Sequence, residues 1–384
     1  TEGRTNYKYI AEILFVGDSV TSYQLEVDPQ SDGFGVFNFE DVTKDFVTHD
    51  LTIPVDNQEG FLTNPNSYKG FTPIYGESYG SPPEDTLGVT TGSTVYAFNG
   101  ALSHNDFVDW ASSGYIVSDF ERKFLTLSTM TFRSPLLGNT GRRDFKIASD
   151  ENAWLYIMTD TDDNAYEILI QVHDGTSATN YVLDNTNYRT VTGNPDNRFL
   201  RIPAGTRNLN KINPSDLSTG ALPIIDDNTK EYSIIVRDSS QTHMTEQFVF
   251  FVKENCSPYT PYRLHFLNEL GGFDSFTFYN RNERITEVER GTYRKVQGRY
   301  SSGAWSISKD ERNRNNYSTI YNRKLTLHSD WITEAEGTWL EGLITSPVVY
   351  WDDNDTLIPI EVTNSEYRGG RDENGELVNL TLEV

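Results

Sequence analysis

The stretch AYEILIQVHDGTSATNYVLD (165–184) contains two apolar runs that are separated by Gly, Thr and Ser, as in two short strands joined by a turn. The same pattern recurs across residues 145–255, where turn residues separate seven such runs. The runs are FKIAS (145–149), AWLYIMT (153–159), AYEILIQVHD (165–174), NYVLD (180–184), RFLRIPA (198–204), YSIIVRDS (232–239) and QFVFFVKEN (247–255). Seven short strands with intervening turns are typical of an immunoglobulin-like or fibronectin-like β-sandwich. We therefore expect one such domain over 144–256.

Strand patterns continue on the N-terminal side of this segment. YKYIAEILFVG (7–17) and SYQLEVDP (22–29) read as the first two strands, and GFGVFNFED (33–41) as a continuation of the same meander. Between residues 57 and 92 the chain is rich in Gly, Pro, Tyr and Ser, which predicts a long loop. Loops of this length usually carry function or contact other subunits. We expect an N-terminal β domain over 1–143 that carries this loop.

The C-terminal part, 257–384, reads as a further β domain with one short helix. Thr333 and Glu336 have the spacing of a capping box, and apolar residues follow at helical intervals, so the sequence predicts a helix over 333–345. Short linkers at 136–144 and 257–262 separate the segments. The expected fold is mainly β, with two or three tandem β-sandwich domains.

Composition excludes several classes of protein. The chain has 384 residues, and its aromatic share of 13% compensates for a hydrophobic share of only 36% in building β-sheet cores. The net charge of −24 repels phosphate, so nucleic acid and anionic membranes are poor partners, and no apolar run is long enough to span a bilayer. The single Cys256 cannot form an intrachain disulfide, and the N-terminus has no apolar signal region, so we expect a protein that is made without export.

Two serine motifs suggest hydrolase chemistry, but each lacks a feature that this chemistry requires. ILFVGDSVT (13–21) is similar to the nucleophile block of SGNH esterases, which would make Ser19 the nucleophile, but none of the six histidines has Asp three residues before it. Residues 76–80 match G-x-S-x-G around Ser78, but Pro82 and Pro83 prevent the helix that this motif requires. A serine hydrolase therefore ranks last, and we expect no catalytic residue and no cofactor.

Two acidic runs resemble calcium-binding loops in part. Asp160–Asn164 imitates the start of an EF-hand loop, but Ala165 and Gln171 replace its glycine and its final glutamate. A similar run covers Asp352–Asp355. We interpret both as solvated hairpin turns and expect no metal site, with a weakly held Ca²⁺ as the open alternative.

The basic residues gather in two segments, RNERITEVERGTYRKVQGR (281–299) and KDERNRNNYSTIYNRK (309–324), where they alternate with Glu. Nucleic-acid binding would require fewer carboxylates. The mixed signs favour salt-linked strands or a surface that meets an acidic neighbour, which in a homo-oligomer could be the same protein; a plain solvated face is the alternative. Candidate interface residues are Arg284, Arg290 and Arg294.

Three further segments carry a resemblance to a known group. These are RLHFLNELGGFDSFTF (263–278), LTLHSDWITEAEGTWLEGLITSPVVYW (325–351) and YKYIAEILFVGDSVTSYQLEVDPQSDGFGVFNFEDV (7–42). Their layout resembles structural proteins of tailed phages that infect Bacteroidetes, the crAss-like phages and flavophages. The resemblance implies a virion component of the tail, collar or tail tip, assembled in the host cytoplasm, and it carries over no catalytic residue.

The first hypothesis is therefore a structural virion protein that assembles as a homo-oligomer, in a ring or hub, and contacts other tail or collar proteins. The second is a module that binds a receptor or a host-surface glycan through exposed aromatic side chains. Its candidates are Tyr68, Tyr75, Tyr79 and Trp351, for which ordinary core or interface packing is the plain alternative.

Overall fold

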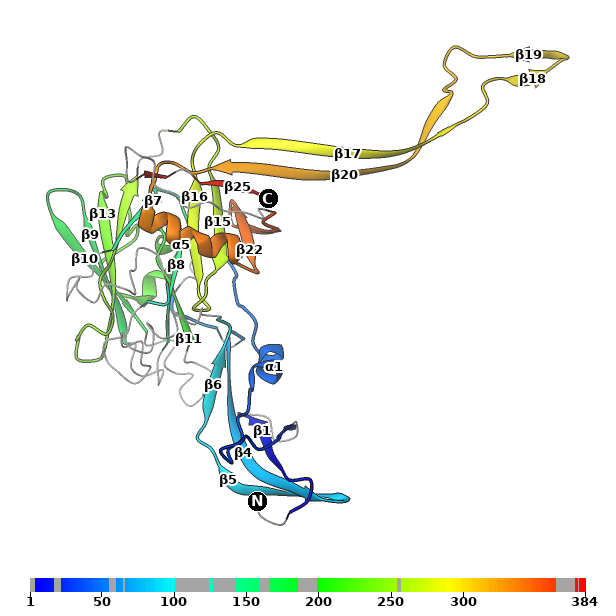
Figure 1. The fold of residues 1–384 in the computed structure, drawn as a ribbon. Helices are drawn as coiled ribbons and strands as arrows, with labels where there is room; N and C mark the ends of the chain where they lie inside the picture. The colour runs from blue at the N-terminus through cyan, green and yellow to red at the C-terminus, as the bar shows by residue number, and fades with distance from the viewer. Residues whose placement is uncertain are drawn as a thin grey trace.

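The computed structural model describes residues 4–16, 22–54, 60–64, 66–100, 124–126, 143–158, 166–185, 199–253, 257–363, 377–378 and 380–384. The described chain is mainly β, as expected. It forms an N-terminal sheet, a body of three stacked sheets, and a long hairpin arm (Figure 1). Ser19, Asp160–Asn164 and Cys256 lie outside the described residues.

The N-terminal sheet has the strand order β2-β1-β4-β5, with β6 paired to β4. Its elements, with the short helices that follow β2, are β1 (Lys8–Phe15), β2 (Ser22–Val27), α1 (Glu40–Thr43), η1 (Lys44–Phe46), β4 (Tyr68–Gly80), β5 (Pro83–Thr91) and β6 (Val95–Phe98). Ile13, Phe15 and Phe71 form a small core on one face of the sheet, and Phe39 and Phe46 cover them.

The expectation of a loop over 57–92 is wrong, because most of this range, residues 68–91, forms the β4–β5 hairpin. Gly76 lies at a bulge in this pairing, and a Cβ there would come 2.2 Å from the carbonyl oxygen of Thr86. The glycine therefore permits a close backbone approach inside a strand instead of marking a loop. The expected strand over 33–41 is also wrong, because the Asn38 side chain accepts from the Glu40 amide and α1 begins there.

The body begins with a six-stranded sheet in the order β12-β10-β9-β13-β14-β7, in which β7 runs parallel to β14. Its strands are β7 (Arg143–Ala148), β9 (Glu167–His173), β10 (Ala178–Asp184), β12 (Leu217–Thr219), β13 (Glu231–Arg237) and β14 (Phe248–Lys253). A middle sheet, β3-β11-β8, packs on it through one shared apolar core. The middle sheet contains β3 (Leu62–Thr63), β11 (Phe199–Pro203) and β8 (Trp154–Met158), and α4 (Thr206–Leu209) and η2 (Pro214–Asp216) follow β11. Every one of the seven strands that the sequence predicts in 145–255 is present.

The third sheet, β16-β15-β22-β23, covers the other face of the middle sheet. Its strands are β15 (Tyr262–Leu267), β16 (Phe273–Phe278), β22 (Val349–Asp353) and β23 (Thr356–Ile360). Strand β8 is buried on both faces, since Leu155 and Ile157 face the six-stranded sheet while Trp154 and Tyr156 pack with Phe273. The middle sheet takes β3 from the first expected domain and β8 and β11 from the second, and its core with the third sheet includes residues of the third domain. The boundaries at 143/144 and 256/257 stay predictions.

The predicted helix is confirmed as α5 (Glu334–Thr345). The Thr333 hydroxyl accepts from the Glu336 amide at 3.2 Å, and the Glu336 carboxylate accepts from the Thr333 amide at 2.7 Å. Both bonds satisfy donors that a helix N-terminus leaves free. Trp339 and Leu340 pack against the outer face of β15.

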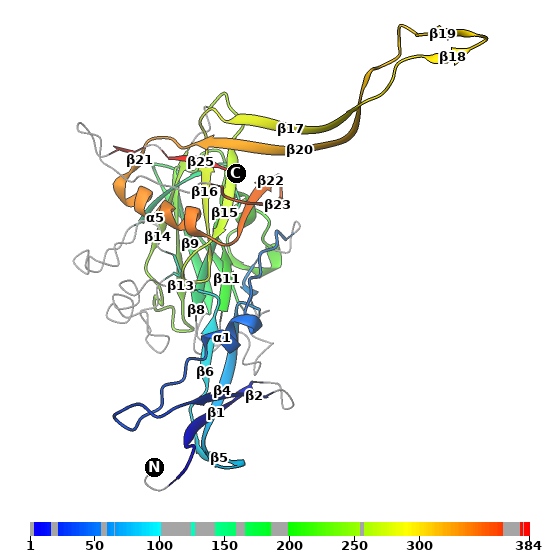
Figure 2. The same cartoon turned by 45° about the vertical axis from the view of Figure 1, so that its right-hand side comes forward.

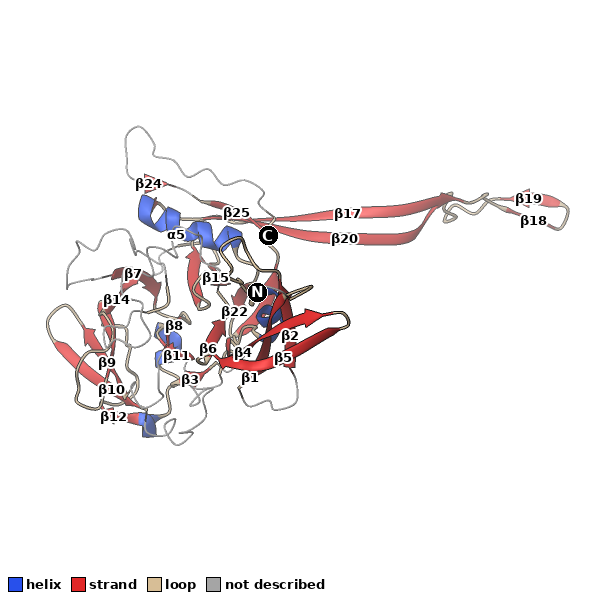
Figure 3. Cartoon of the chain, turned by 60° about the horizontal axis from the view of Figure 1, so that its bottom comes forward, coloured by secondary structure: helices blue, strands red, loops and turns tan. Residues whose placement is uncertain are grey.

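The arm, residues 281–324, leaves the opposite end of the body from the N-terminal sheet (Figures 1 and 2). It consists of β17 (Glu283–Arg294) and β20 (Arg314–His328), with β18 (Arg299–Ser301) and β19 (Ala304–Ser306) at its tip. At its base β25 (Thr381–Glu383) pairs with β20, and β21 (Ile332–Thr333) pairs with β24 (Leu377–Val378). A strand of the length of β17 reaches about 40 Å, so the tip stands far from the body (Figure 3).

Candidate functional site

The arm is a two-stranded ribbon with two open edges over most of its length. Within the described chain, β17 pairs only with β20, and β20 meets a third strand only at Thr326–His328. Two-stranded ribbons are marginally stable in water, and unpaired edges are sites for association with other chains. The arm therefore has the geometry of an element that is completed by a partner.

The register gives the two faces of the ribbon opposite charge. Residues directly opposite each other share a face, and side chains alternate between faces along each strand. One face, here called the basic face, contains five arginines and no carboxylate: Arg284, Arg290, Arg294, Arg314 and Arg323. The other face carries Glu283, Glu287 and Glu289 with one base, Lys324, which lies 2.9 Å from Glu287. The three sequence candidates Arg284, Arg290 and Arg294 thus fall on the same face.

The arginines of the basic face have exposed side chains and, within the described chain, no ion-pair partner. Their contacts are with neutral groups: Arg284 Nε donates to the Tyr262 hydroxyl at 2.8 Å, and Arg314 Nε donates to Thr292 at 3.0 Å. Arg323 lies over the Tyr321 ring at 5.6 Å. Five uncompensated guanidinium groups on one face favour a partner that supplies carboxylates.

Exposed apolar side chains gather on the same element. The described chain has seventeen large apolar residues that are exposed, and ten of them lie in the arm. These ten are Ile285, Val288, Tyr293, Val296, Tyr300, Trp305, Ile307, Tyr317, Ile320 and Tyr321. At the tip, Tyr300 and Trp305 are directly opposite each other and are 72% and 52% exposed. The ten side chains lie on both faces of the ribbon and at its tip, and such a concentration of exposed apolar side chains on one element is typical of an interaction site.

Charge is divided sharply between the arm and the rest of the protein. Residues 281–324 contain eleven Arg and Lys against five Asp and Glu, whereas the remaining chain contains 21 basic and 51 acidic residues. The arm therefore has a net charge of +6, and the rest of the chain −30. The sequence shows the basic cluster but not its isolation in space, because the projection of the arm depends on the pairing of β17 with β20.

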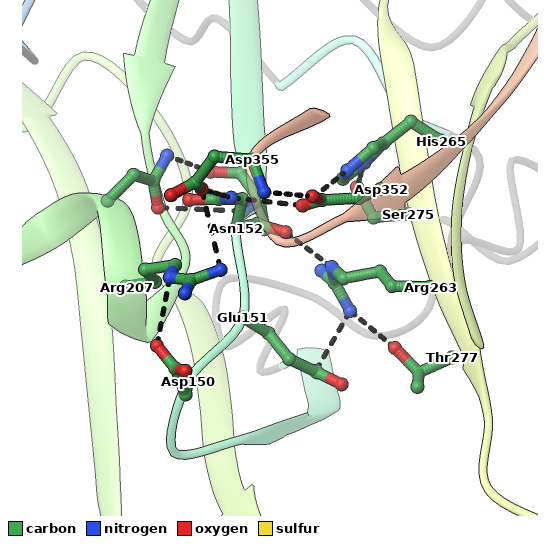
Figure 4. A network of polar contacts seen from close by, with 12 residues as sticks. Asp150, Glu151, Asn152, Arg207, Arg263, His265, Ser275, Thr277, Asp352 and Asp355 are labelled. Atoms are coloured by element: carbon green, nitrogen blue, oxygen red, sulfur yellow. Dashed lines mark hydrogen bonds and ion pairs between the residues drawn. The ribbon is translucent and has the colours of Figure 1, made fainter. Parts of the chain in front are cut away.

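A second polar constellation is buried between the middle and third sheets (Figure 4). Arg263, on β15, donates to Glu151 at 2.9 Å, to Thr277 at 2.8 Å and to the carbonyl oxygen of Asn152. The Tyr279 hydroxyl donates to the same Glu151 carboxylate at 2.7 Å. Burial and this carboxylate raise the pKa of Tyr279 far above its ordinary value. The buried charges of Arg263 and Glu151 compensate each other, and the network thereby connects the third sheet to the turn before β8 of the middle sheet.

Between the same two sheets, Ser275, His265 and Asp352 form a chain of hydrogen bonds. The three residues come from separate strands, so the sequence pattern Asp-x-x-His could not reveal them. Ser275 Oγ lies 2.7 Å from His265 Nδ1, and His265 Nε2 lies 3.4 Å from Asp352 Oδ2. Burial lowers the pKa of His265, so its ring is neutral at pH 7. Burial alone raises the pKa of Asp352, but hydrogen bonds from His265, Asn152 and the Asp355 amide hold it well below its ordinary value.

A neutral ring beside an ionised carboxylate fixes the protons in this group. Nε2 carries the hydrogen and donates to Asp352, so Nδ1 accepts from Ser275. The order resembles a hydrolytic triad, but His265 is fully buried and Ser275 is 4% exposed. A substrate carbonyl cannot approach Ser275 in this conformation, and we interpret the group as part of the interlayer network.

The acidic turn Asp352–Asp355 also belongs to this network. Asn152 Nδ2 donates to Asp352 at 2.9 Å and to Asp355 at 2.7 Å, and Lys211 Nζ lies 2.8 Å from Asp355. Its interpretation as a solvated turn holds only in part, since Asp352 is nearly buried while Asp352 Oδ1 does accept from the Asp355 amide. Protein groups already compensate these carboxylates, and no metal-binding cluster of three or more ligands occurs among the described residues.

The aromatic candidates from the sequence lie against other side chains. Tyr68 is 3% exposed and packs in the core beside Tyr96. The Tyr75 ring lies 5.8 Å from the Phe37 ring, and the Trp351 ring lies 5.1 Å from the Tyr262 ring. Arg4 lies over the Tyr79 ring at 4.2 Å. Ser78 is 3% exposed inside β4.

No protein-family model matches this chain, and searches of the curated proteins and of the solved structures return no match either. Across the parts of the chain that the structure describes, no helix has the length and apolarity needed to cross a membrane. Function is therefore inferred from the arm and the buried network themselves.

Proposed function

We propose that this chain is a non-enzymatic structural protein of a tailed-phage virion, which uses its arm to join neighbouring subunits of a tail, collar or tail-tip assembly. One observation carries the proposal: a ribbon with open edges projects from an otherwise well-packed body. It exposes ten large apolar side chains and five arginines that have no ion-pair partner in the described chain. Such a surface is costly in isolation and gains free energy when a partner covers it. The resemblance of three sequence segments to phage structural proteins supports the virion setting.

The rest of the fold suits this role. The buried charge network and the doubly covered β8 make the body a rigid platform, so that the arm holds a defined direction. We further propose that the six-stranded sheet and the middle sheet, which share one apolar core, form an immunoglobulin-like sandwich. Bodies of this kind are joined in series in structural assemblies, where contacts between subunits carry the function.

The test shortens the arm without changing the body. Thr286 and Arg323 are directly opposite each other, so replacing residues 287–322 by Asn-Gly closes the hairpin with a two-residue turn. We expect the intact chain to form a discrete multimer in light scattering, and the shortened chain to be monomeric with an unchanged circular dichroism melting curve. Equal multimers from both chains would overturn the role of the arm. Mass spectrometry of purified particles from the encoding phage tests the virion setting.

A second function is favoured by one observation at the arm tip. Tyr300 and Trp305 present an exposed aromatic pair, which is the kind of surface that stacks on sugar rings. Host-glycan binding would then take place at the tip, since Tyr68 is buried and Tyr75, Tyr79 and Trp351 pack on other side chains. Glycan-array binding that is lost in Trp305→Ala, with the multimer intact, would establish this function.

A further inference from the structure

The N-terminal sheet carries a surface whose charge is opposite to that of the arm. Residues 9–43 contain seven Asp and Glu and no Lys, Arg or His. Within them, residues 26–41, here called the acidic strip, expose the carboxylates Glu26, Asp28, Asp32, Glu40 and Asp41. Glu26 pairs with Lys8 at 2.8 Å and Asp41 with Lys44 at 2.7 Å, but within the described chain Asp28, Asp32 and Glu40 have no ion-pair partner.

The acidic strip also exposes apolar side chains. Phe34 and Val36 are 69% and 64% exposed, among the highest values outside the arm. Trp331 is equally exposed, but the neighbouring carboxylate of Asp330 is already paired with Lys253. The strip is therefore a place where carboxylates without an ion-pair partner in the described chain coincide with exposed apolar groups. This combination is complementary to the basic face of the arm.

We propose that the basic face of the arm docks on the acidic strip of a second copy of this chain. This inference rests on the proposed function and names the partner and its surface. The guanidinium groups of Arg290, Arg294 and Arg323 would lie on the carboxylates of Asp28, Asp32 and Glu40, with Val288 and Tyr321 covering Phe34 and Val36. Planar guanidinium groups form paired hydrogen bonds with carboxylates, and covering apolar surface adds free energy to the contact.

The position of the two surfaces determines the kind of assembly. The acidic strip runs from the end of β2 to α1, beside the N-terminal sheet at one end of the body, and the arm leaves the other end and points away (Figures 1 and 2). The two surfaces are different, so each copy uses its arm on one neighbour and its strip on another. Such a head-to-tail contact gives a ring when the rotation closes and a filament when it does not.

Charge reversal in two matched variants tests the contact. The arm variant carries Arg290→Glu, Arg294→Glu and Arg323→Glu, and the strip variant carries Asp28→Lys, Asp32→Lys and Glu40→Lys; all six positions are exposed. We expect each variant alone to be monomeric in light scattering, because arm and strip then repel. An equimolar mixture should recover multimers in which the two variants alternate, and the chain with all six changes should assemble by itself. Added salt should weaken the wild-type multimer.

The control reverses the other face of the arm, with Glu287→Lys and Glu289→Lys. This variant should assemble like the wild type, and equal loss of assembly would overturn the assignment of the face. A strip variant that assembles alone, a mixture that stays monomeric, or a wild-type chain that is monomeric at every concentration would each overturn the proposal. If nucleic acid copurifies with the wild-type chain but not with the arm variant, the basic face binds phosphate and the proposal is overturned.

The arm-shortened chain separates the two levels of inference. If shortening the arm leaves the multimer unchanged, the proposed function itself fails. If shortening the arm abolishes the multimer but reversing the strip does not, the arm joins subunits at another surface and only the present inference fails.

Discussion

Arg263 Nη1 and Glu151 Oε2 form an ion pair of 2.9 Å in which both side chains are almost fully buried, 6% and 7% exposed. The pair connects β15 of the third sheet to the turn before β8 of the middle sheet. Because both groups are almost completely removed from water, each depends on the other for compensation of its charge.

Arg263→Met should destabilise the protein strongly. It removes one partner and leaves the Glu151 carboxylate buried without its counter-ion, which costs about 3–5 kcal/mol. The double variant Arg263→Met, Glu151→Leu should recover a large part of this loss, since no charge is then left uncompensated. Urea unfolding of the wild type, both single variants and the double variant measures the coupling; additive losses would contradict a paired role.

The pH dependence of stability should report the neutral state of His265. Its pKa is lowered in the folded protein, so below its ordinary value of 6.5 the unfolded chain binds a proton that the folded chain does not. Stability should therefore fall as the pH decreases from 7.5 to 5, by at most about 1.4 kcal/mol per pH unit from this residue. His265→Gln should flatten the melting temperature against pH, whereas the exposed His243→Gln should not. Equal slopes in both variants would mean that other groups dominate.

Two glycines should respond with opposite sign to the same substitution. In α5, a Cβ on Gly342 would make an ordinary contact of 3.7 Å with Phe266, so Gly342→Ala should stabilise the protein by about 0.5–1 kcal/mol through helix propensity. In β4, a Cβ on Gly76 would collide with the Thr86 backbone at 2.2 Å, so Gly76→Ala should destabilise it. Thermal unfolding of the two variants gives the answer, and a neutral Gly76→Ala would contradict the tight bulge.

Limited proteolysis should distinguish the free arm from the docked arm. The arm contains eleven Arg and Lys on a ribbon with open edges, and the strands of the body are packed in layers. Trypsin should therefore cut the dissociated chain first between Lys295 and Arg314, and this cleavage should slow markedly at concentrations where the multimer forms. Mass spectrometry of the early fragments checks both statements; first cleavage inside 231–253 would oppose them.

The sequence predicts local structure well where the signal is local. The capping box of Thr333 and Glu336 predicts α5 almost to the residue, and the seven apolar runs of 145–255 predict their strands. The prediction from sequence fails where a glycine is needed because a distant segment of the chain passes close to it. Gly76 reads as a loop signal, and only the strand that passes beside it shows that the position needs a residue without a side chain.

The site is less accessible to sequence reasoning than the fold. Arg284, Arg290 and Arg294 could be named as interface candidates, but their common face depends on the register of β17 with β20. The buried group of Ser275, His265 and Asp352 comes from three strands with no shared motif, so no spacing in the chain could reveal it. Both features depend on which distant strands pair and in which register, and a single sequence does not reveal this pairing.

The double burial of β8 sets an order of events during synthesis. Strand β3 must wait for its only described partner, β11, which leaves the ribosome much later, and one face of β8 stays open until β15 and β16 have been made. The nascent chain therefore exposes Trp154 and Tyr156 until nearly three quarters of it has been translated. Such an intermediate is prone to aggregation, so the yield of folded protein should depend on slow translation and on chaperones that hold this surface until the third layer arrives.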